Sequence, residues 1–326
     1  SSDLRDLKQL DEQILELMKE RVTKTNSEHV SEIEQLTKQL DLIASTVSYK
    51  TTFTPSPLVG YQGVSGAFSE QACQNFFSKD VKTIGYPEFE DVYIALKNGD
   101  IDYGVLPIEN SSTGAINDNY DLIRKYGFYI VGETAVNVDQ CLMGIKGTKL
   151  EDIKEVYSHP QGLAQSSDFF FAHRYMNPMP YKDTAMAAQY VSEAKDPTKA
   201  AIASRLACEL YGLEMLQEAI QNDKTNKTRF MVVSREFISP VDSDKVSVIF
   251  TLPHVVGSLS TMLGITTLYG VNLEKIESRP IKEENWQYYF YIDFLGNMRD
   301  GSVSKAIEEM KAKASTFRLL GNYKKA

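Results

Sequence analysis

Three polar segments, far apart in the chain, carry side chains that could do chemistry together. They are residues 107–111 (Pro-Ile-Glu-Asn-Ser), residues 158–161 (Ser-His-Pro-Gln) and a segment in which Asn226 precedes Thr228, Arg229 and Phe230. Each follows or opens an expected strand, and none has the composition of a core. Hydroxyls, amides and a guanidinium that converge suit an anionic organic substrate. We therefore predict that the three segments meet in the cleft of an enzyme.

Several of these residues have more than one chemical interpretation. Asn110 and Ser111 are natural neutral donors to a carboxylate, although either could instead cap a helix. Glu109 could be a base, or it could anchor a neighbouring helix N-terminus. Arg229 could bind a carboxylate through its guanidinium fork, and Thr228 could offer its hydroxyl to a leaving group. The alternative for the last two is an exposed strand start.

The segment 158–161 and one further segment, residues 63–69, add polar groups to the expected cleft. Ser158 and Gln161 are candidate donors, whereas His159 is either a general acid or a structural residue before a proline. Residues 63–69 form a turn in which Ser65, Gly66 and Phe68 precede a helix that we expect Ser69 to cap. Such a turn could hold an oxygen-rich ligand with backbone N–H groups, but a plain strand-to-helix turn has the same sequence.

Composition narrows the classes of function. The chain has 326 residues, of which 42% are hydrophobic, so it can bury the cores of two or three domains. A net charge of -9 argues against nucleic acid or an anionic membrane as partner. No apolar run suits a membrane span and the N-terminus is charged, which favours the cytoplasm. Cys73, Cys141 and Cys208 are odd in number and widely spaced, so we expect no disulfide framework and no metal site.

The periodicity of apolar residues predicts a modular chain of α/β and α+β parts. Residues 1–50 read as two amphipathic helices and residues 51–57 as a linker. Strands and helices alternate over residues 58–239, which favours a parallel sheet with helices on its faces and a crossing into a second lobe after residue 131. Residues 240–326 read as βαββαβ, an antiparallel sheet with two helices on one face. The strands are expected at 58–61, 81–86, 103–108, 129–131, 140–145, 155–157, 200–203 and 230–233, and the helices at 70 onward, 90–98, 162–173 and 184–194.

Five segments in order resemble the prephenate dehydratase family: residues 63–72, 107–111, 158–161, 183–188 and 226–230. The resemblance implies a two-lobed catalytic domain like periplasmic binding proteins over residues 58–239, which converts prephenate to phenylpyruvate without a cofactor. Thr228 matches the catalytic threonine of that family. The substrate-binding residues that it implies are Ser65, Gly66, Phe68, Glu109, Asn110, Ser111, Ser158, Gln161, Thr184, Arg229 and Phe230.

Residues 240–326 resemble the regulatory ACT domain of the same family. The matching residues are Gly257, Ser258 and Leu259, and Glu277, Ser278, Arg279 and Pro280. The resemblance implies that phenylalanine binds between two subunits as a feedback inhibitor, in a homodimer or homotetramer.

Residues 1–50 resemble the chorismate mutase domain that often precedes this dehydratase. Arg21 falls on one of its substrate-binding arginines, but Arg5 is out of register, and the loop and second helix that supply the other charged groups are absent. The segment is either shortened in the protein or interrupted in the sequence given. Without those cations we expect no mutase activity.

Two other functions fit the same residues. Arogenate dehydratase acts on a substrate in which an amino group replaces the side-chain keto group. A cleft fused to an ACT domain could also sense an amino acid without chemistry, and the polar groups around Thr228 and Asn110 favour the enzyme.

Overall fold

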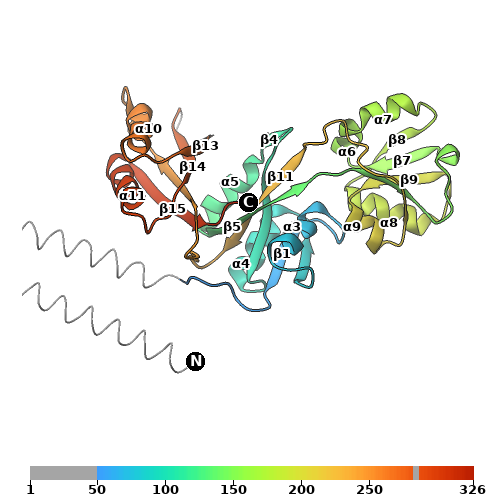
Figure 1. The fold of residues 1–326 in the computed structure, drawn as a ribbon, viewed down its shortest axis with the longest axis horizontal. Helices are drawn as coiled ribbons and strands as arrows, with labels where there is room; N and C mark the ends of the chain where they lie inside the picture. The colour runs from blue at the N-terminus through green and yellow to red at the C-terminus, as the bar shows by residue number, and fades with distance from the viewer. Residues whose placement is uncertain (1–49, 282–285) are drawn as a thin grey trace, which may run out of the picture. The chain divides into compact units, whose positions relative to one another are not determined.

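The computed structural model describes residues 50–281 and 286–326. The chain divides into two units, Ser1–Thr51 and Thr52–Ala326. The expected N-terminal helices and Arg21 lie outside the described residues, so the fold below is that of the second unit (Figure 1).

The first lobe is built on a mixed sheet in the order β2-β1-β3-β11-β5, with β4 paired to β3. Its strands are β1 (Leu58–Gln62), β2 (Lys82–Tyr86), β3 (Tyr103–Asn110), β4 (Gly114–Ala115), β5 (Tyr129–Asn137) and β11 (Lys227–Ser234). Strand β1 runs parallel to β2 and β3, as predicted. Strand β11 is antiparallel to β3 and β5, so the prediction of a parallel sheet was wrong for this strand. The chain leaves the lobe along β5 and returns along β11, and these two strands therefore run in opposite directions.

Three helices belong to the first lobe: α3 (Phe68–Phe76), α4 (Phe89–Asn98) and α5 (Asn117–Tyr126). Helix α4 begins at a capping box between Glu88 and Asp91 and ends at Gly99, whose left-handed φ of 85° suits glycine. Helix α3 begins at Phe68 with Ala67 at the N-cap position. Ser69 therefore lies inside the helix and does not cap it, contrary to the prediction.

The second lobe is a sheet in the order β10-β6-β9-β7-β8. Its strands are β6 (Cys141–Gly144), β7 (Glu155–Ser158), β8 (Asn177–Pro180), β9 (Lys199–Ala203) and β10 (Glu214–Gln217), and its α-helices are α6 (Pro160–Gln165), α7 (Ser167–Ala172), α8 (Thr184–Ala194) and α9 (Arg205–Leu210). The crossing between β5 and β6 lies where the sequence predicted it. The single helix predicted over residues 162–173 is instead two short helices that meet at Ser166.

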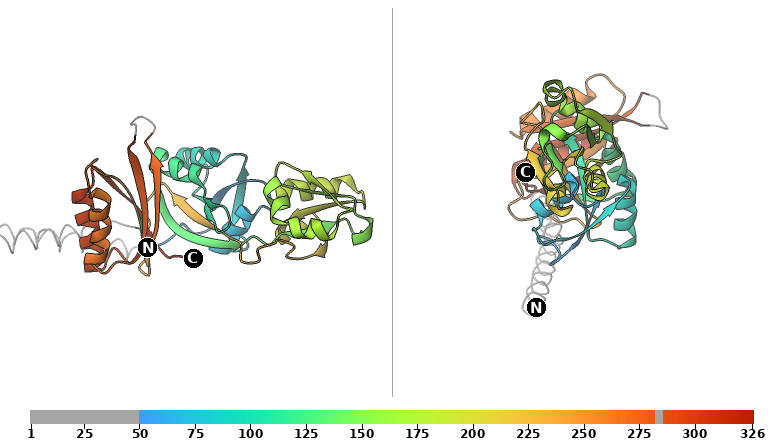
Figure 2. Two further views of the ribbon diagram at one scale, coloured as in Figure 1. Left: turned by 90° about the horizontal axis from the view of Figure 1, so that it is seen from above. Right: turned by 90° about the vertical axis from the view of Figure 1, so that its right-hand side faces the viewer.

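The C-terminal segment, residues 240–326, has the predicted βαββαβ order. Its elements are β12 (Lys245–Thr251), α10 (Ser258–Leu268), β13 (Leu273–Pro280), β14 (Tyr288–Leu295), α11 (Gly301–Lys313) and β15 (Thr316–Tyr323). The strands form an antiparallel sheet in the order β13-β14-β12-β15. Figure 2 shows both helices on the face of this sheet that is remote from the first lobe.

The other face of the C-terminal sheet packs on the first lobe. Ile249, Tyr291 and Leu320 share one hydrophobic core with Ile130 and Met231 of the first lobe. Every residue of β12 is buried, because helices cover one of its faces and the first lobe covers the other. The C-terminal segment thus reaches the back of β11, the strand that carries Thr228.

The segment expected to be a linker is attached to the first lobe. The Phe53 ring makes edge contacts with Phe76 and Phe77, and the Thr54 amide donates to the Tyr103 hydroxyl at 2.9 Å. Aromatic burial of this kind fixes the chain just before β1. Within the described residues, no helix combines the length and apolar character that crossing a membrane requires.

Candidate active site

Thr228 and Asn110 form a hydrogen-bonded pair across strands β11 and β3. They are register partners, and the Asn110 Nδ2 atom donates to Thr228 Oγ1 at 2.9 Å and to Asn226 Oδ1 at 2.8 Å. Thr228 is 9% exposed and Asn110 is 6% exposed. Because Oγ1 already accepts an N–H, the hydroxyl proton of Thr228 remains available to donate to a ligand.

Local hydrogen bonds fix the orientation of the Asn110 amide. Its Oδ1 atom accepts from the backbone amides of Ser112 and Thr113 at 3.0 and 3.1 Å, which close the turn after β3. The nitrogen end must then face Thr228. The Ser111 hydroxyl accepts from the Lys227 amide at 2.9 Å, so it joins the ends of β3 and β11.

A cleft of about 420 Å³ opens beside this pair, between the two lobes. Five residues predicted from the sequence line it: Phe68, Asn110, Gln161, Thr184 and Thr228. The central prediction, that distant polar segments share one hollow, is therefore what the structure shows. The remaining lining residues are Gln62, Phe89, Thr113, Ile116, Val138, Gln140, His159, Gly162, Gln165, Lys182 and Asp183.

Helix α8 directs its N-terminus into the cleft. Asp183 caps the helix, since its Oδ1 atom accepts from the amides of Ala185 and Met186 at 2.7 and 3.2 Å. Thr184 is the first helical residue, and Lys182 precedes the cap. Among the described residues that line the cleft, Lys182 is the only lysine or arginine. The Lys182 ammonium group favours an anion at this end of the cleft, whereas the first free amides of the helix already bind the Asp183 carboxylate.

His159 lies at the cleft as a helix cap. Its Nδ1 atom accepts from the Gln161 amide at 3.2 Å at the start of α6. This contact agrees with the structural interpretation of His159.

Ser158 and Phe230 do not line the cleft. Ser158 is fully buried, and its hydroxyl donates to the Ile202 carbonyl oxygen at 2.7 Å. Phe230 is 2% exposed and belongs to the hydrophobic core. Their expected substrate contacts are therefore corrected: both side chains are committed to packing inside their lobes.

The backbone carbonyl groups of the turn at Ser65 and Gly66 are hydrogen-bonded to side chains of the second lobe. The Ser204 hydroxyl donates to the Gly66 carbonyl at 2.6 Å, and the Tyr211 hydroxyl donates to the Ser65 carbonyl at 2.8 Å. A Cβ atom on Gly66 would lie 2.9 Å from the Cα atom of Ala207. Glycine at this position allows the backbone to pack closely against the second lobe. The expectation that the turn approaches a ligand is therefore corrected.

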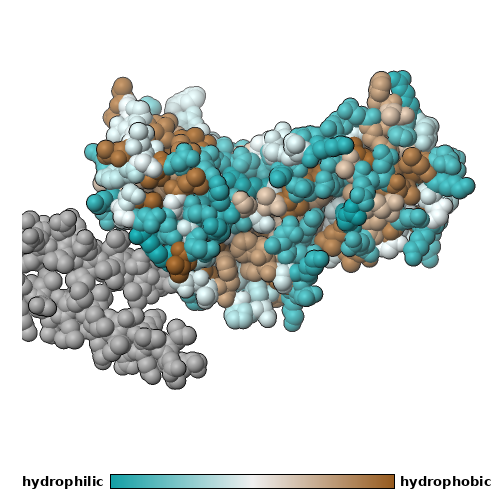
Figure 3. Space-filling model, viewed as in Figure 1, coloured by the Kyte–Doolittle hydropathy of each residue, from teal (hydrophilic) through white to brown (hydrophobic). Residues whose placement is uncertain are grey.

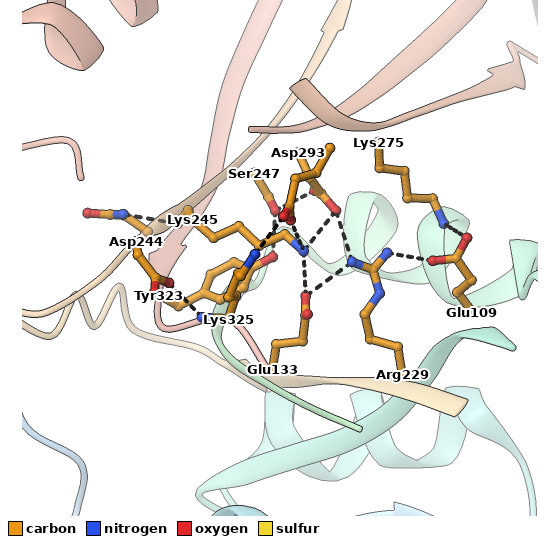
Figure 4. Close-up of polar contacts among 12 residues, drawn as sticks. Glu109, Glu133, Arg229, Asp244, Lys245, Ser247, Lys275, Asp293, Tyr323 and Lys325 are labelled. Atoms are coloured by element: carbon orange, nitrogen blue, oxygen red, sulfur yellow. Dashed lines mark hydrogen bonds and ion pairs between the residues drawn. The ribbon is translucent and has the colours of Figure 1, made fainter. Parts of the chain in front are cut away.

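Arg229 and Glu109 face away from the cleft, because successive residues of a strand point to opposite faces. The Arg229 Nη2 atom lies 2.7 Å from Glu109 Oε2, and its Nη1 atom lies 3.4 Å from Glu133 and 3.7 Å from Asp293. We therefore correct the expectation that Arg229 binds a substrate carboxylate in this cleft. The carboxylates that it contacts belong to the protein (Figure 4).

A charged network continues from Arg229 into the C-terminal segment. Lys245, 1% exposed, lies 2.9 Å from Glu133, and Lys275 lies 3.0 Å from Glu109. Burial alone raises the pKa of Glu109, but the ion pair with Lys275 and the charge of Arg229 outweigh it and lower this pKa overall. Burial opposes the charge of Arg229, yet Glu133, Asp293 and Glu109 hold its pKa above the ordinary value.

The two effector motifs expected in the C-terminal segment lie at different places. Gly257, Ser258 and Leu259 line a pocket of about 640 Å³ at the start of α10, and residues 277–280 do not line it. Arg279 instead makes an ion pair with Asp121 of α5, at 2.7 Å.

Sequence reasoning missed Lys182, Gln140 and Gln165 as cleft residues. Lys182 could have been found, since a lysine directly before a capped helix adds positive charge to a helix N-terminus. Nothing in the local sequence distinguishes Gln140 or Gln165 from surface glutamines. Gln140 is buried, and its Nε2 atom donates to Gln165 Oε1 at 3.3 Å.

Fold and cleft together define a two-lobed, mixed α/β protein with a polar cleft between its lobes and a C-terminal βαββαβ segment. Residues 59–237 match the family model described as prephenate dehydratase. The chain belongs to the prephenate dehydratase family.

Relatives with described activities support this assignment. The chain is 36% identical to arogenate dehydratase 2 of Petunia hybrida, over 81% of the chain and 71% of that protein. It is 33% identical to the bifunctional chorismate mutase/prephenate dehydratase of Neisseria gonorrhoeae, over 81% and 74%. The crystal structure of prephenate dehydratase from Arthrobacter aurescens in complex with L-Phe superposes with a TM-score of 0.75 at 30% identity, covering 82% of this chain and 89% of that one.

Proposed function

We propose that the protein is a prephenate dehydratase, which converts prephenate to phenylpyruvate, carbon dioxide and water. The observation that carries the proposal is the Asn110–Thr228 hydrogen bond inside a cleft lined by both lobes. Asn110 orients the Thr228 hydroxyl so that its proton can be donated to a departing group.

The reaction breaks two bonds of the substrate. The bond between the ring and its carboxylate gives up its electron pair to the ring, and the carbon–oxygen bond on the opposite side of the ring breaks, so that the ring becomes aromatic. The leaving hydroxide needs a proton or a strong donor. Thr228 supplies a hydrogen bond, or relays a proton from water, because a threonine hydroxyl is too weak an acid to remain ionised.

The cleft distributes charge in a way that suits a dianion. Lys182, at the N-terminal end of α8, would bind one carboxylate, that of the side chain. Neutral groups, Gln161 and Thr113 among them, line other parts of the cleft. A ring carboxylate placed among neutral groups is weakly solvated, which favours loss of carbon dioxide.

A direct assay tests the proposal. Purified protein is supplied separately with chorismate, prephenate and arogenate, and the consumption of each is followed together with phenylpyruvate or phenylalanine formation. Prephenate consumption with phenylpyruvate formation is the expected result. Phenylalanine binding without any turnover would instead favour the sensor.

Arogenate dehydration is the second candidate, and Asp183 is the observation that favours it. Among the described cleft-lining residues Asp183 carries the only carboxylate, and the ammonium group of arogenate could pair with it. Asp183→Asn keeps an N-cap acceptor and removes the charge. If the ammonium group binds there, this variant lowers kcat/KM for arogenate and leaves kcat/KM for prephenate nearly unchanged.

We also propose that the C-terminal segment is an ACT domain that binds phenylalanine between two copies of the chain. The separation of residues 257–259 from residues 277–280 supports a site that one copy cannot complete. Val255, Val256 and Trp286 around the pocket are strongly exposed, and Figure 3 shows hydrophobic surface on this segment. Analytical ultracentrifugation with and without phenylalanine, together with inhibition assays, tests this proposal.

Chorismate mutase activity is not proposed for the sequence as it stands. The assay with chorismate decides the matter directly, since a bifunctional protein would consume it.

A further inference from the structure

Two neighbouring residue pairs on β3 and β11 face opposite sides of the sheet. Thr228 pairs with Asn110, and the next pair in the register is Arg229 with Glu109. The first pair lies at the cleft, and the second lies on the back of the sheet. Because each pair shares its backbone with the other, a displacement of Glu109 or Arg229 displaces Asn110 and Thr228.

The C-terminal segment binds the pair on the back of the sheet. Lys275 of β13 lies 3.0 Å from Glu109 Oε1, while Arg229 occupies Glu109 Oε2 at 2.7 Å. Asp293 of β14 approaches Arg229 from the same side, at 3.7 Å. Figure 4 shows Glu109 bracketed by Lys275 and Arg229, with both cations directed at its carboxylate.

Burial on the Lys275 side makes this contact hard to replace by water. The side chains of Lys275 and Asp293 are 11% and 13% exposed, and that of Glu109 is 37% exposed. Without Lys275, Arg229 still holds Glu109 Oε2, but Oε1 loses its cation. We expect the Glu109 carboxylate to turn toward solvent or toward Arg229, and the end of β3 to shift with it.

We propose that Lys275 is a positioning residue for turnover: from the C-terminal segment it holds Glu109, and through the Glu109–Arg229 pair it fixes the Asn110–Thr228 hydrogen bond in the cleft. This inference rests on the proposed dehydratase function and extends it. It gives the C-terminal segment a part in basal catalysis, in the absence of any effector.

Lys275→Met in the full chain tests the inference through a split between kcat and KM. The substitution removes the charge and keeps most of the side chain. We expect kcat for prephenate to fall on the order of tenfold, as is typical of coupling through residues remote from the ligand. KM is expected to change less than twofold, since Lys182 and the other cleft residues are intact. Lys275→Arg, which retains the charge, is expected to recover most of the lost kcat.

Lys324→Met is the matched control. Lys324 lies 2.7 Å from Asp244, so the ion pair is confined to the C-terminal segment and touches neither Glu109 nor Arg229. We expect its kcat to equal that of the wild type. Equal losses of kcat in Lys275→Met and Lys324→Met would overturn the inference, because they would indicate a general effect of charge or stability.

Hydrogen exchange gives a readout that does not depend on turnover. The Ser111 amide donates to the Lys227 carbonyl at 2.9 Å and ties the ends of β3 and β11 together. We expect faster exchange in residues 107–113 and 226–230 of Lys275→Met, and no change there in Lys324→Met. Unchanged exchange in a folded Lys275→Met overturns the inference.

This readout also separates the two proposals. A wild-type protein that does not consume prephenate refutes the proposed function. In that case hydrogen exchange still tests whether Lys275 positions the ends of β3 and β11, because this measurement does not require turnover. Thermal unfolding confirms that each variant is folded. If Lys275→Met does not fold, Lys275→Gln, which keeps a polar end group, takes its place in both measurements.

Discussion

The Asn110 amide donates to the Thr228 hydroxyl at 2.9 Å, and the same amide group is fixed from behind by the turn that follows β3. Thr228 thus acts as an acceptor toward the protein and keeps its proton for the cleft. This directionality is a structural reason to assign the donor role to the threonine. The hydrogen bond that orients Thr228 therefore depends on the pairing of β3 with β11.

Removal of the Thr228 hydroxyl is the first prediction. Thr228→Val keeps the shape of the side chain, and we expect kcat for prephenate to fall about 10²- to 10³-fold, as on loss of a donor to a developing negative charge. Thr228→Ser retains the hydroxyl and should keep much of the activity. Steady-state kinetics and thermal unfolding of both variants check the prediction. A Thr228→Val protein with wild-type kcat would remove Thr228 from the mechanism.

Asn110→Asp tests the donor end of the Asn110 amide separately from its acceptor end. The variant keeps an acceptor for the amides of Ser112 and Thr113, but it loses the donor to Thr228 and to Asn226. We expect lower kcat and a loss of roughly 1–3 kcal/mol in unfolding free energy, because the buried Asn226 oxygen loses its 2.8 Å donor and keeps only the Ser111 hydroxyl at 3.4 Å. Chemical denaturation and steady-state kinetics measure both effects. Full activity in this variant would show that Asn110 does not orient Thr228.

Lys182→Met tests the anion-binding end of the cleft. We expect KM for prephenate to rise about tenfold, which corresponds to roughly 1.4 kcal/mol of lost binding, and kcat to change little. Lys195→Met is the control, since Lys195 caps the far end of the same helix. Lys182→Arg should keep KM close to the wild-type value. Equal KM values for the wild type and Lys182→Met would place the substrate carboxylate elsewhere.

Acid should remove the stability that Glu109 contributes. Lys275 and Arg229 lower the pKa of Glu109 in the folded protein despite its burial. A group whose folded pKa is lowered stabilises the fold above its unfolded pKa, about 4.3 for Glu, and loses this contribution as pH falls through the folded pKa. Glu109→Gln should therefore melt below the wild type at pH 6. The difference in Tm should shrink as pH falls below the unfolded value of about 4.3 and through the lowered folded pKa, because the wild-type carboxyl group is protonated in the folded state only below that folded pKa.

Calorimetry between pH 3 and 6 measures that difference. The comparison with Glu109→Gln cancels the acid sensitivity of other carboxylates. A Tm difference that stays constant across the range would show that the charge of Glu109 does not stabilise the fold.

Gly66→Ala tests the contact between the lobes. Gly66 has a φ of +92°, and an added Cβ would lie 2.9 Å from the Ala207 backbone, so we expect a loss of roughly 2–4 kcal/mol from conformational strain and overpacking combined. Gly212→Ala is the control, because Gly212 has a φ of +63° with nothing within 4 Å of its added Cβ. Its loss should be limited to about 1–2 kcal/mol. Equal unfolding free energies for the two variants would show that the close approach to Ala207 carries no cost.

Much of the fold follows from local patterns in the chain. Helix α8 was predicted with the bounds that the structure gives it, because Asp183 caps a run of good helix formers. Most strands were found because they are short apolar runs between turn residues. Helix α5 was missed, since Asn117 and Asp118 open it with polar residues that resemble a loop. Helices α6 and α7 were merged, because only the kink at Ser166 separates them.

The sequence by itself determined the alternation of elements, the βαββαβ order and the three polar segments that were expected to meet. These follow from periodicity and from the positions where strands end. Only the tertiary structure decided which side chains face the cleft. Thr228 and Arg229 are adjacent in one strand, so alternation places them on opposite faces of the sheet, but nothing local shows which of the two faces the cleft. That choice depends on which strands flank β11 and on the carboxylates that the C-terminal segment brings to its far side, and both are contacts between residues distant in the sequence.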